Sequence, residues 1–284
     1  MTEESRGGSR NARIIAVANQ KGGVGKTTTA INLATSIALS GRRVLLIDVD
    51  PQGNLTSGVG LKGSKADAGT VYEALMTDAD PESFVIPTRV ENLFAIPADR
   101  NLTGAEIELV PMLAREHRLK RIVGVLRGQF DDIFIDCPPS LGLLTLNALV
   151  AADAVLIPLH CEYFALEGLA DLVGTMRLVR TALNPGLDIE GVLLTMYDDR
   201  TNLGQQVSAN IREHFGEKVY KTVVPRNIRL GEAPSHGVPV ILYDARSRGA
   251  EAYVALAHEF LGRHRPPPDT VIAARPDAQS DPQP

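Results

Sequence analysis

The sequence contains few cysteines and no long apolar run. Cys137 and Cys161 are far apart and lack the spacing of a metal site, which is the usage expected in a reducing compartment. No stretch of 18 apolar residues is present, and the polar N-terminus has no apolar segment of the kind found in signal peptides. These absences predict a cytoplasmic protein.

The sequence also lacks an excess of positive charge. Its formal net charge is −5 at pH 7, which argues against a protein that covers nucleic acid with its whole surface but does not exclude a local basic face. The 284 residues are 44% hydrophobic and 22% charged, as in a soluble globular chain with a large core. For this length we expect one large domain.

The two ends of the sequence differ in composition from its middle. Residues 1–12 form a polar leader rich in glycine and serine, and residues 265–284 form a tail rich in proline. Neither composition can pack a core, so we expect both ends to be disordered. We therefore assign residues 13–264 to a single folded domain.

Short apolar runs alternate with amphipathic stretches in this domain. Helices are predicted over residues 26–41, which end on a glycine, and over residues 167–183. Strands that are apolar throughout and separated by helices indicate an α/β fold with a mostly parallel, twisted sheet covered by helices on both faces. The predicted strands are residues 13–19, 43–48, 93–98, 131–136, 154–159, 191–197 and 219–225.

The stretch KGGVGKTT, residues 21–28, lies where such a fold binds ligands, between the first strand and a helix. Its glycines let the backbone approach a phosphate, and the helix adds its positive dipole end. Lys26 can neutralise the β and γ phosphates, and the Thr27 hydroxyl can bind Mg²⁺. The fold is thus predicted to be similar to that of P-loop nucleoside triphosphatases. The predicted nucleotide-binding residues here are Gly22, Gly23, Val24, Gly25, Lys26, Thr27 and Thr28.

Three aspartates follow apolar strands. Asp48 and Asp50 end the stretch LLIDVD, where two carboxylates facing a triphosphate can hold the hydration shell of Mg²⁺ or orient an attacking water. Asp50 also precedes a proline, so a role in forming the turn remains an alternative. Asp136 ends DDIFID in the Walker B position, where it can contact Mg²⁺ through water, and Cys137 beside it is interpreted as packing.

Four motifs together resemble those of one family. KGGVGKTT, LLIDVDPQGN, DDIFIDCPPS and VPRNIRLGEAPS occur in the order and spacing of the ParA/Soj family of chromosome and plasmid partition ATPases. These proteins belong to a class with a deviant Walker A motif, which also includes MinD. The deviation is present here, because Gln20 and Lys21 stand where the standard P-loop begins with glycine.

This resemblance implies a Mg²⁺-dependent ATPase with a slow basal rate. Lys21 is expected to reach the phosphates of ATP bound by the other subunit of a homodimer, and Asp50 is expected to orient the water. Pro225 and Asn227 are expected to lie against the adenine ring. By the same resemblance the catalytic residues are Lys21, Lys26 and Asp50, Asp136 also contributes to cofactor binding, and the metal residues are Thr27, Asp48 and Asp136.

The resemblance also implies DNA binding. Residues 197–265 contain ten Lys or Arg against eight acidic residues, and this bias alone favours a solvated surface over a nucleic-acid site. The family, however, binds double-stranded DNA without sequence preference through arginines of this region, which Arg200 and Arg229 match best. The expected protein is an ATP-dependent dimer associated with the nucleoid, whose hydrolysis is stimulated by a ParB-type centromere-binding protein.

Three other functions remain as alternatives. A MinD-like protein would anchor to a membrane through a C-terminal amphipathic helix, and the prolines of the tail argue against one, so no membrane partner is expected. An electron-transfer ATPase similar to the nitrogenase iron protein would need two suitably placed cysteines to share an iron–sulfur cluster, which Cys137 and Cys161 do not suit. An ordinary kinase would need an acceptor site, of which the sequence gives no sign.

Overall fold

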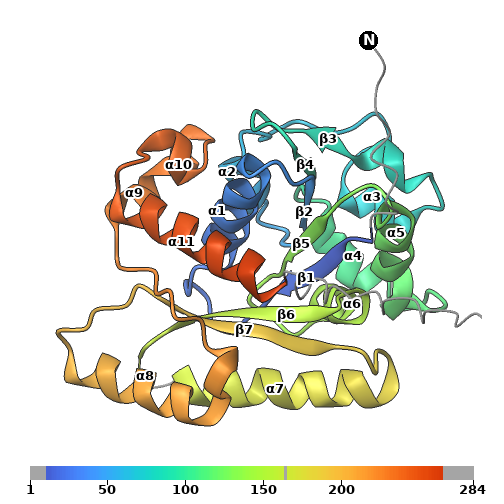
Figure 1. Ribbon diagram of the computed structural model, residues 1–284. Helices are drawn as coiled ribbons and strands as arrows, with labels where there is room; N and C mark the ends of the chain where they lie inside the picture. The colour runs from blue at the N-terminus through green and yellow to red at the C-terminus, as the bar shows by residue number, and fades with distance from the viewer. Residues whose placement is uncertain (1–10, 163–164, 265–284) are drawn as a thin grey trace, which may run out of the picture.

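The computed structural model describes residues 11–162 and 165–264 (Figure 1). The predicted tail, residues 265–284, and residues 1–10 of the predicted leader lie outside these ranges. In the described part, no helix is both long enough and apolar enough to cross a membrane.

A seven-stranded sheet forms the centre of the fold, with the strand order β3-β4-β2-β5-β1-β6-β7. Neighbouring strands pair in parallel, except β3, which pairs with β4 in the antiparallel sense. The predicted fold class is therefore confirmed. The strands are β1 (Arg13–Val17), β2 (Val44–Asp48), β3 (Ile86–Pro87), β4 (Leu93–Ile96), β5 (Asp132–Asp136), β6 (Ala154–His160) and β7 (Asp188–Thr195).

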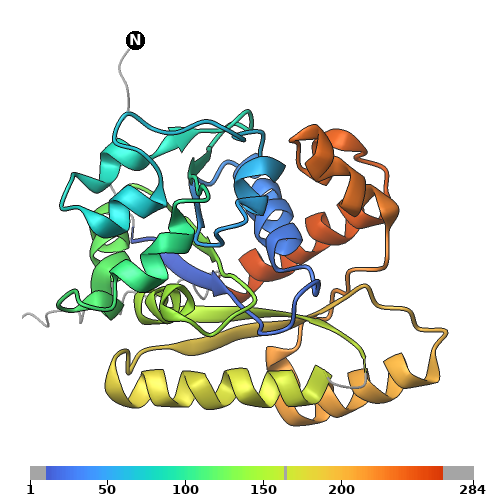
Figure 2. The ribbon, with the colours of Figure 1, turned by 180° about the vertical axis from the view of Figure 1, so that it is seen from behind.

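Helices cover both faces of the sheet. Those from α3 to α8 pack on one face, and α1, α2 and α9 to α11 pack on the other. Figures 1 and 2 show this from opposite sides, with α7 and α8 beneath β6 and β7 in both views. The helices are α1 (Lys26–Leu39), α2 (Asn54–Gly58), α3 (Val71–Met76), α4 (Leu102–Glu108), α5 (Arg118–Leu126), α6 (Leu143–Ala151), α7 (Ala165–Ala182), α8 (Asn202–Phe215), α9 (Ile228–Glu232), α10 (Val240–Tyr243) and α11 (Arg248–Arg263).

Four short 3₁₀ helices complete the fold within the described residues. They are η1 (Pro81–Phe84), η2 (Arg115–His117), η3 (Gly216–Lys218) and η4 (Ala233–His236).

The central strands are apolar throughout because each of their faces meets a separate layer of helices. In β1, Ile14 and Ala16 pack into one core, whereas Ile15 and Val17 pack into the other. Side chains of a strand alternate between the two faces, so neither face of these strands can carry polar residues. The polar groups begin where the strands end, which places the functional residues at the carboxyl edge of the sheet.

One predicted strand, residues 219–225, is wrong. This segment forms no continuous ladder with β7: it meets β7 and the residues just after it at two isolated bridges, Val192 with Val219 and Tyr197 with Pro225, and Val224 donates one backbone hydrogen bond to Leu194. Between the bridges, the backbone N–H groups of Lys221 and Thr222 donate to the carboxylate of Glu259 on α11, each over 2.8 Å. The apolar pattern was that of a strand, but a side chain from a distant helix takes the hydrogen bonds that a strand would give to its neighbour.

The first prediction concerns Gly191 in β7. A Cβ atom at this position would lie 2.5 Å from the ring of Tyr220 and 2.9 Å from the carbonyl oxygen of Lys218. Because backbone blocks that space, we expect Gly191→Ala to lower the free energy of unfolding by about 1–3 kcal/mol in urea titrations. Gly174→Ala in α7, where the added Cβ meets no atom within 4 Å, should raise it by about 0.5–1 kcal/mol. Equal shifts of the same sign in both variants would contradict this account.

Candidate functional site

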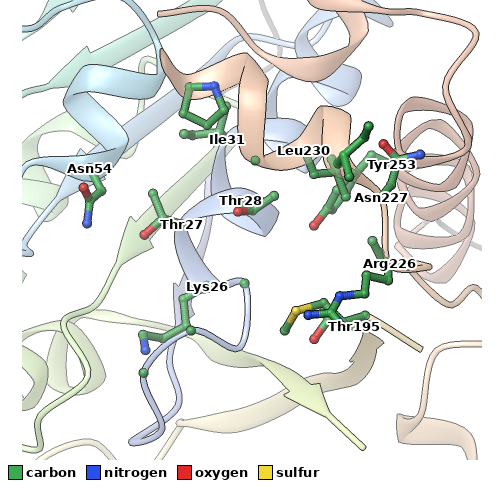
Figure 3. A pocket seen from close by; sticks show the side chains of 18 of the residues that line it. Lys26, Thr27, Thr28, Ile31, Asn54, Thr195, Arg226, Asn227, Leu230 and Tyr253 are labelled. Atoms are coloured by element: carbon green, nitrogen blue, oxygen red, sulfur yellow. The ribbon is translucent and has the colours of Figure 1, made fainter. Parts of the chain in front are cut away.

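A cavity of about 770 Å³ opens at the carboxyl edge of the sheet. One side is formed by the P-loop (residues 21–28) and the turn after β2, and the other by residues 224–235 and Tyr253 of α11. Figure 3 shows Lys26 and Thr27 across the cavity from Arg226 and Asn227. The cavity thus joins segments that are about 200 residues apart in the sequence.

The P-loop bends back over the start of α1. Gly23 and Gly25 take φ angles of 75° and 87°, in the left-handed region that side chains rarely adopt. A Cβ atom at Gly22 or Gly23 would meet no protein atom within 4 Å, so the space beside this backbone is open to a ligand. The buried Val24 fixes the loop, because its carbonyl oxygen accepts a 2.8 Å hydrogen bond from the hydroxyl of Thr195 at the end of β7.

Lys26 is the first residue of α1 and is only 7% exposed. Its Nζ donates to the carbonyl oxygen of Lys21 over 3.1 Å, which leaves other N–H donors of the ammonium for a ligand. Burial lowers the pKa of Lys26, and the negative charges of Asp136 and Asp50 oppose this shift. A bound anion would relieve the cost of burying this cation.

Asp48 and Asp136 stand side by side at the ends of β2 and β5. Asp48 accepts hydrogen bonds from the backbone and hydroxyl of Thr56, over 2.9 and 2.7 Å. Burial raises the pKa of Asp48 to about 6, against the effect of these bonds. In the structure both carboxylate oxygens of Asp48 accept hydrogen bonds, Oδ2 from Thr56 and Oδ1 from the backbone of Asp50, and these are the atoms that would bind the predicted metal.

The Asp136 carboxylate differs from that of Asp48, because neither of its oxygens has a hydrogen-bond partner among the described residues. Burial raises its pKa well above the usual value, and the charge of Asp48 raises it further. The Thr27 hydroxyl opposes this rise but does not reach hydrogen-bond geometry. A buried carboxylate without a partner, next to a hydroxyl and an open phosphate cradle, fits a bound Mg²⁺ ion.

The described residues hold no group of three or more His, Cys, Asp or Glu side chains arranged around a metal position. A single carboxylate and a hydroxyl are the donor set of a Mg²⁺ site in which phosphate oxygens and water supply the remaining ligands. The residues present therefore fit a nucleotide and its metal together.

Asp50 lines the cavity on the turn after β2 and is 7% exposed. Its Oδ1 accepts from the backbone of Gln52 over 3.0 Å, and its own backbone N–H donates to Asp48 over 3.2 Å. The two roles considered for Asp50 are thus compatible: the side chain stabilises the turn and also faces the cavity, where its predicted role in orienting water stays a prediction.

Residues 12–189 match a family model described as an AAA domain. The sporulation initiation inhibitor protein Soj of Bacillus subtilis is 60% identical over 248 residues, which cover 87% of this chain and 97% of that protein. The chromosome partitioning protein ParA of Myxococcus xanthus is 54% identical over 261 residues, or 92% of each chain. This chain belongs to the ParA/Soj family of partition ATPases. The resemblance seen in the four sequence motifs is thereby confirmed.

A solved structure supports the same assignment of the fold. Cobyrinic acid a,c-diamide synthase from Mycobacterium smegmatis, crystallised with ADP and magnesium and also with an ATP analogue and magnesium, superposes with a TM-score of 0.75. It is 38% identical in sequence, and the match covers 88% of this chain and 94% of that one. The ligands in that structure agree with the ATP and Mg²⁺ predicted for this ParA/Soj family member.

Lys21, the extra lysine of the ParA/Soj family, is not among the residues that line the cavity. Its ammonium forms an ion pair with Glu162, in the loop that follows β6. Its backbone N–H donates to Oδ1 of Asn19 over 3.0 Å. The two lysines of the P-loop therefore have different surroundings, one inside the cavity and one outside.

The predicted adenine residues, Pro225 and Asn227, both line the cavity opposite the P-loop. The Oδ1 of Asn227 also caps α9 by accepting from the backbone of Arg229 over 2.9 Å. Contact with the base stays a prediction. Cys137 is buried and free, as the packing interpretation requires, and burial raises the pKa of its thiol.

Several cavity residues were not predicted from the sequence. Met196 follows β7 with a φ angle of 47°, and the hydroxyl of the buried Tyr253 lies 3.1 Å from that of Thr29. Arg226 and Leu230 stand within a recognised motif and could have been found from it, whereas no local pattern marks the others. The unpredicted lining residues include Thr195, Met196, Arg226, Leu230 and Tyr253.

The two arginines predicted to bind DNA lie outside the cavity, and both are paired with acids. Arg200 is 85% exposed and contacts both oxygens of Asp198, over 2.8 and 2.6 Å. Arg229 contacts Glu232 over 2.8 Å and Asp244 over 3.3 Å. Contact of either arginine with DNA stays a prediction and would require these pairs to be shared or broken.

The second prediction concerns Asp136. Its raised pKa means that ionising it in the nucleotide-free fold costs free energy, and this cost grows as the pH rises from the unfolded value near 3.8 to the raised folded value. Asp136→Asn removes the cost, so we expect the nucleotide-free variant to gain stability, on the order of 1 kcal/mol, over the unmodified protein at pH 8. The gain should be smaller at pH 5, because this pH lies closer to the unfolded pKa and the folded state then loses less free energy through Asp136.

Thermal unfolding at both pH values, with and without ATP and Mg²⁺, provides the measurement. The variant should lose most of the stabilisation that MgATP gives the unmodified protein, because its affinity for the complex falls. Asp67→Asn, an exposed aspartate, serves as the control and should change neither quantity. A variant that is still fully stabilised by MgATP would disprove the assignment of Asp136.

Proposed function

We propose that this protein is an ATP-driven switch for chromosome or plasmid partition. ATP binding joins two copies into a dimer, the dimer binds double-stranded DNA without sequence preference, and a ParB-type centromere-binding protein stimulates hydrolysis. Membership of the ParA/Soj family supports the partition role. The observation on which the proposal chiefly rests is the different placement of Lys26 and Lys21 within a single P-loop.

Each residue of the site has a distinct task in this proposal. Lys26 and the amides of the P-loop hold the β and γ phosphates of the same chain, and Asp136 with Thr27 holds Mg²⁺. The bound metal supplies positive charge to the transferred phosphoryl group. Asp50 orients the attacking water from the turn after β2. Lys21, which lies outside the cavity of its own chain and is paired with Glu162, acts on the phosphates of a second chain, so hydrolysis is slow until the dimer is complete.

The face that binds DNA is proposed to include the start of α11. Arg246 and Arg248 are exposed and form no ion pair within residues 11–162 and 165–264, unlike Arg200 and Arg229. They lie beside α9, since Gly249 packs against the side chain of Leu230. Free guanidinium groups can pair with phosphates without first releasing an acid, so Arg246 and Arg248 add to the two arginines predicted from the resemblance.

The third prediction separates the roles of Lys21 and Asp50. Lys21→Ala should leave the nucleotide affinity of the single chain largely intact but abolish the ATP-dependent dimer, because the removed charge acts on the other subunit. Asp50→Ala should do the reverse and accumulate a dimer that holds ATP, because its water is no longer oriented. Size-exclusion chromatography with ATP and a phosphate-release assay measure the two effects.

The unmodified protein with ADP is the reference for the single chain in this experiment. If both variants elute as the unmodified protein does with ATP, the proposed assembly is wrong. If Lys21→Ala instead loses nucleotide binding to the extent expected for Lys26→Ala, tenfold or more, then Lys21 acts within its own chain.

The fourth prediction concerns the dependence of DNA binding on salt. If each chain neutralises about three phosphates, the slope of log affinity against log salt is about −3 for one chain and about −5 for the dimer, at about −0.9 per phosphate. Arg248→Glu should weaken binding in the ATP state to every sequence and flatten the dimer slope by about two, because it removes one contact from each chain. Fluorescence anisotropy with random duplexes, using ADP and a nonhydrolysable ATP analogue, provides the measurement.

Arg177→Glu is the matched control, since Arg177 is exposed on α7, on the opposite face of the sheet. It makes the same change in net charge and should leave the slope unaltered. Equal DNA affinity with ADP and with the analogue would rule out the switch. Binding to anionic liposomes in place of DNA would favour the MinD-like alternative.

A further inference from the structure

Glu162 is a residue to which the sequence motifs assign no role. It follows β6, and each of its carboxylate oxygens has a partner: Oε2 pairs with the ammonium of Lys21, and Oε1 lies 2.6 Å from Nδ1 of His160. The hydrogen bond from Lys21 is the main reason that the pKa of Glu162 is lowered. The carboxylate is thus ionised and fixed in place by two neighbours.

Lys21 is held to the end of β6 by its backbone as well. Its N–H donates to Oδ1 of Asn19, and the amide of Asn19 donates to the carbonyl oxygen of Pro158 over 2.8 Å. Asn19 is buried, whereas the side chains of Lys21 and Glu162 are 38% and 44% exposed. The backbone anchor is therefore firm, and the side-chain pair is the part that solvent or a second chain can reach.

A carboxylate and a phosphate compete for the same ammonium group. As long as Glu162 neutralises Lys21, that lysine has less to gain from a phosphate on another chain, because its charge is already compensated. Lys26 has no carboxylate bonded to it: its only hydrogen bond within the described residues goes to a neutral carbonyl group, and Asp136 and Asp50 act on it through their charge alone. This contrast between the two lysines suggests that the pairing of Lys21 has a function.

We propose that Glu162 is an intramolecular stand-in for the partner's phosphates. It pairs with Lys21 in the single chain and must release this lysine before the ATP dimer closes. This inference rests on the proposed function, since it requires Lys21 to act on a second chain. The pair would inhibit dimerisation: when two chains without nucleotide meet, the Lys21 of each is still bound to its own Glu162. Dimerisation then depends on the phosphates displacing Glu162.

The exposure of the Lys21–Glu162 pair sets the expected effect on the dimer dissociation constant. Ion pairs between exposed side chains contribute little, up to about a fivefold change in an equilibrium. Both chains must open their own pair to form a symmetric dimer, so the effects multiply to as much as about 25-fold in the dimer dissociation constant. A barrier of this size restrains assembly without preventing it.

The test measures the dimer dissociation constant by analytical ultracentrifugation with a nonhydrolysable ATP analogue and Mg²⁺. Glu162→Gln removes the negative charge while keeping the shape of the side chain, and it should tighten the dimer by several-fold and at most about 25-fold. Glu162→Ala should act in the same direction. Glu167→Gln changes the charge of an exposed residue on α7, only five positions away, and should have no effect.

Two comparisons keep the result interpretable. Nucleotide affinity of each variant, measured with ADP, should match that of the unmodified protein, which shows that the fold and the cavity are intact. In the background of Lys21→Ala, adding Glu162→Gln should not change assembly further, because the group that Glu162 retains is gone.

The outcomes separate this inference from the proposed function. An unchanged or weaker dimer in Glu162→Gln overturns the inference, and a weaker one would mean that Glu162 orients Lys21 toward the partner instead of retaining it. If Lys21→Ala still dimerises normally with the analogue, the proposed function itself fails. Loss of the dimer in Lys21→Ala together with no effect of Glu162→Gln refutes only the stand-in role.

Discussion

Two carboxylates buried at adjacent strand ends set the chemistry of this protein. Asp48 and Asp136 are in register at the ends of β2 and β5, so the parallel sheet itself brings two like charges together. Asp48 is satisfied by Thr56, but Asp136 has no hydrogen-bond partner in the described part of the chain. The fold tolerates this arrangement because Lys26 lies close enough for its charge to act on Asp136. The site thus leaves the carboxylate of Asp136 without a partner, and a metal ion bound to phosphates would supply one.

The P-loop distributes its positive charge between two environments. Lys26 is buried at the start of α1 within the cavity, and Lys21 is turned to the loop after β6. Gly23 and Gly25, which are among the four residues between the two lysines, take the left-handed conformation that this turn requires. A loop with a single lysine could hold a nucleotide, but it would have no charge left over for another chain. Under the proposed function, the separation of the two lysines links the local backbone conformation to assembly.

Much of the fold and the phosphate-binding part of the site could be predicted from the sequence, because both depend on local patterns. Six of the seven predicted strands occur, and KGGVGKTT forms the loop that its glycines predict. The seventh strand was wrong because Glu259 binds the backbone of Lys221 and Thr222, contacts across 38 and 37 residues that no apolar pattern reveals. Tyr253 and Glu162 were missed for the same reason: an exposed acid or a helical tyrosine looks ordinary until folding places it beside the P-loop or its helix.

Helix α11 connects features that have so far been described separately. Arg248 is in its first turn, and Tyr253 in the second turn forms part of the cavity wall. Near its end, Glu259 accepts hydrogen bonds from the backbone of the segment that leads to Pro225. A single rod of 16 residues thus carries a basic group, a cavity side chain and an anchor for the opposite wall. Because an α-helix moves as a rigid body, a displacement at any of these points is transmitted to the other two. Helix α11 thus forms one continuous physical connection between the cavity and the outer surface of the molecule.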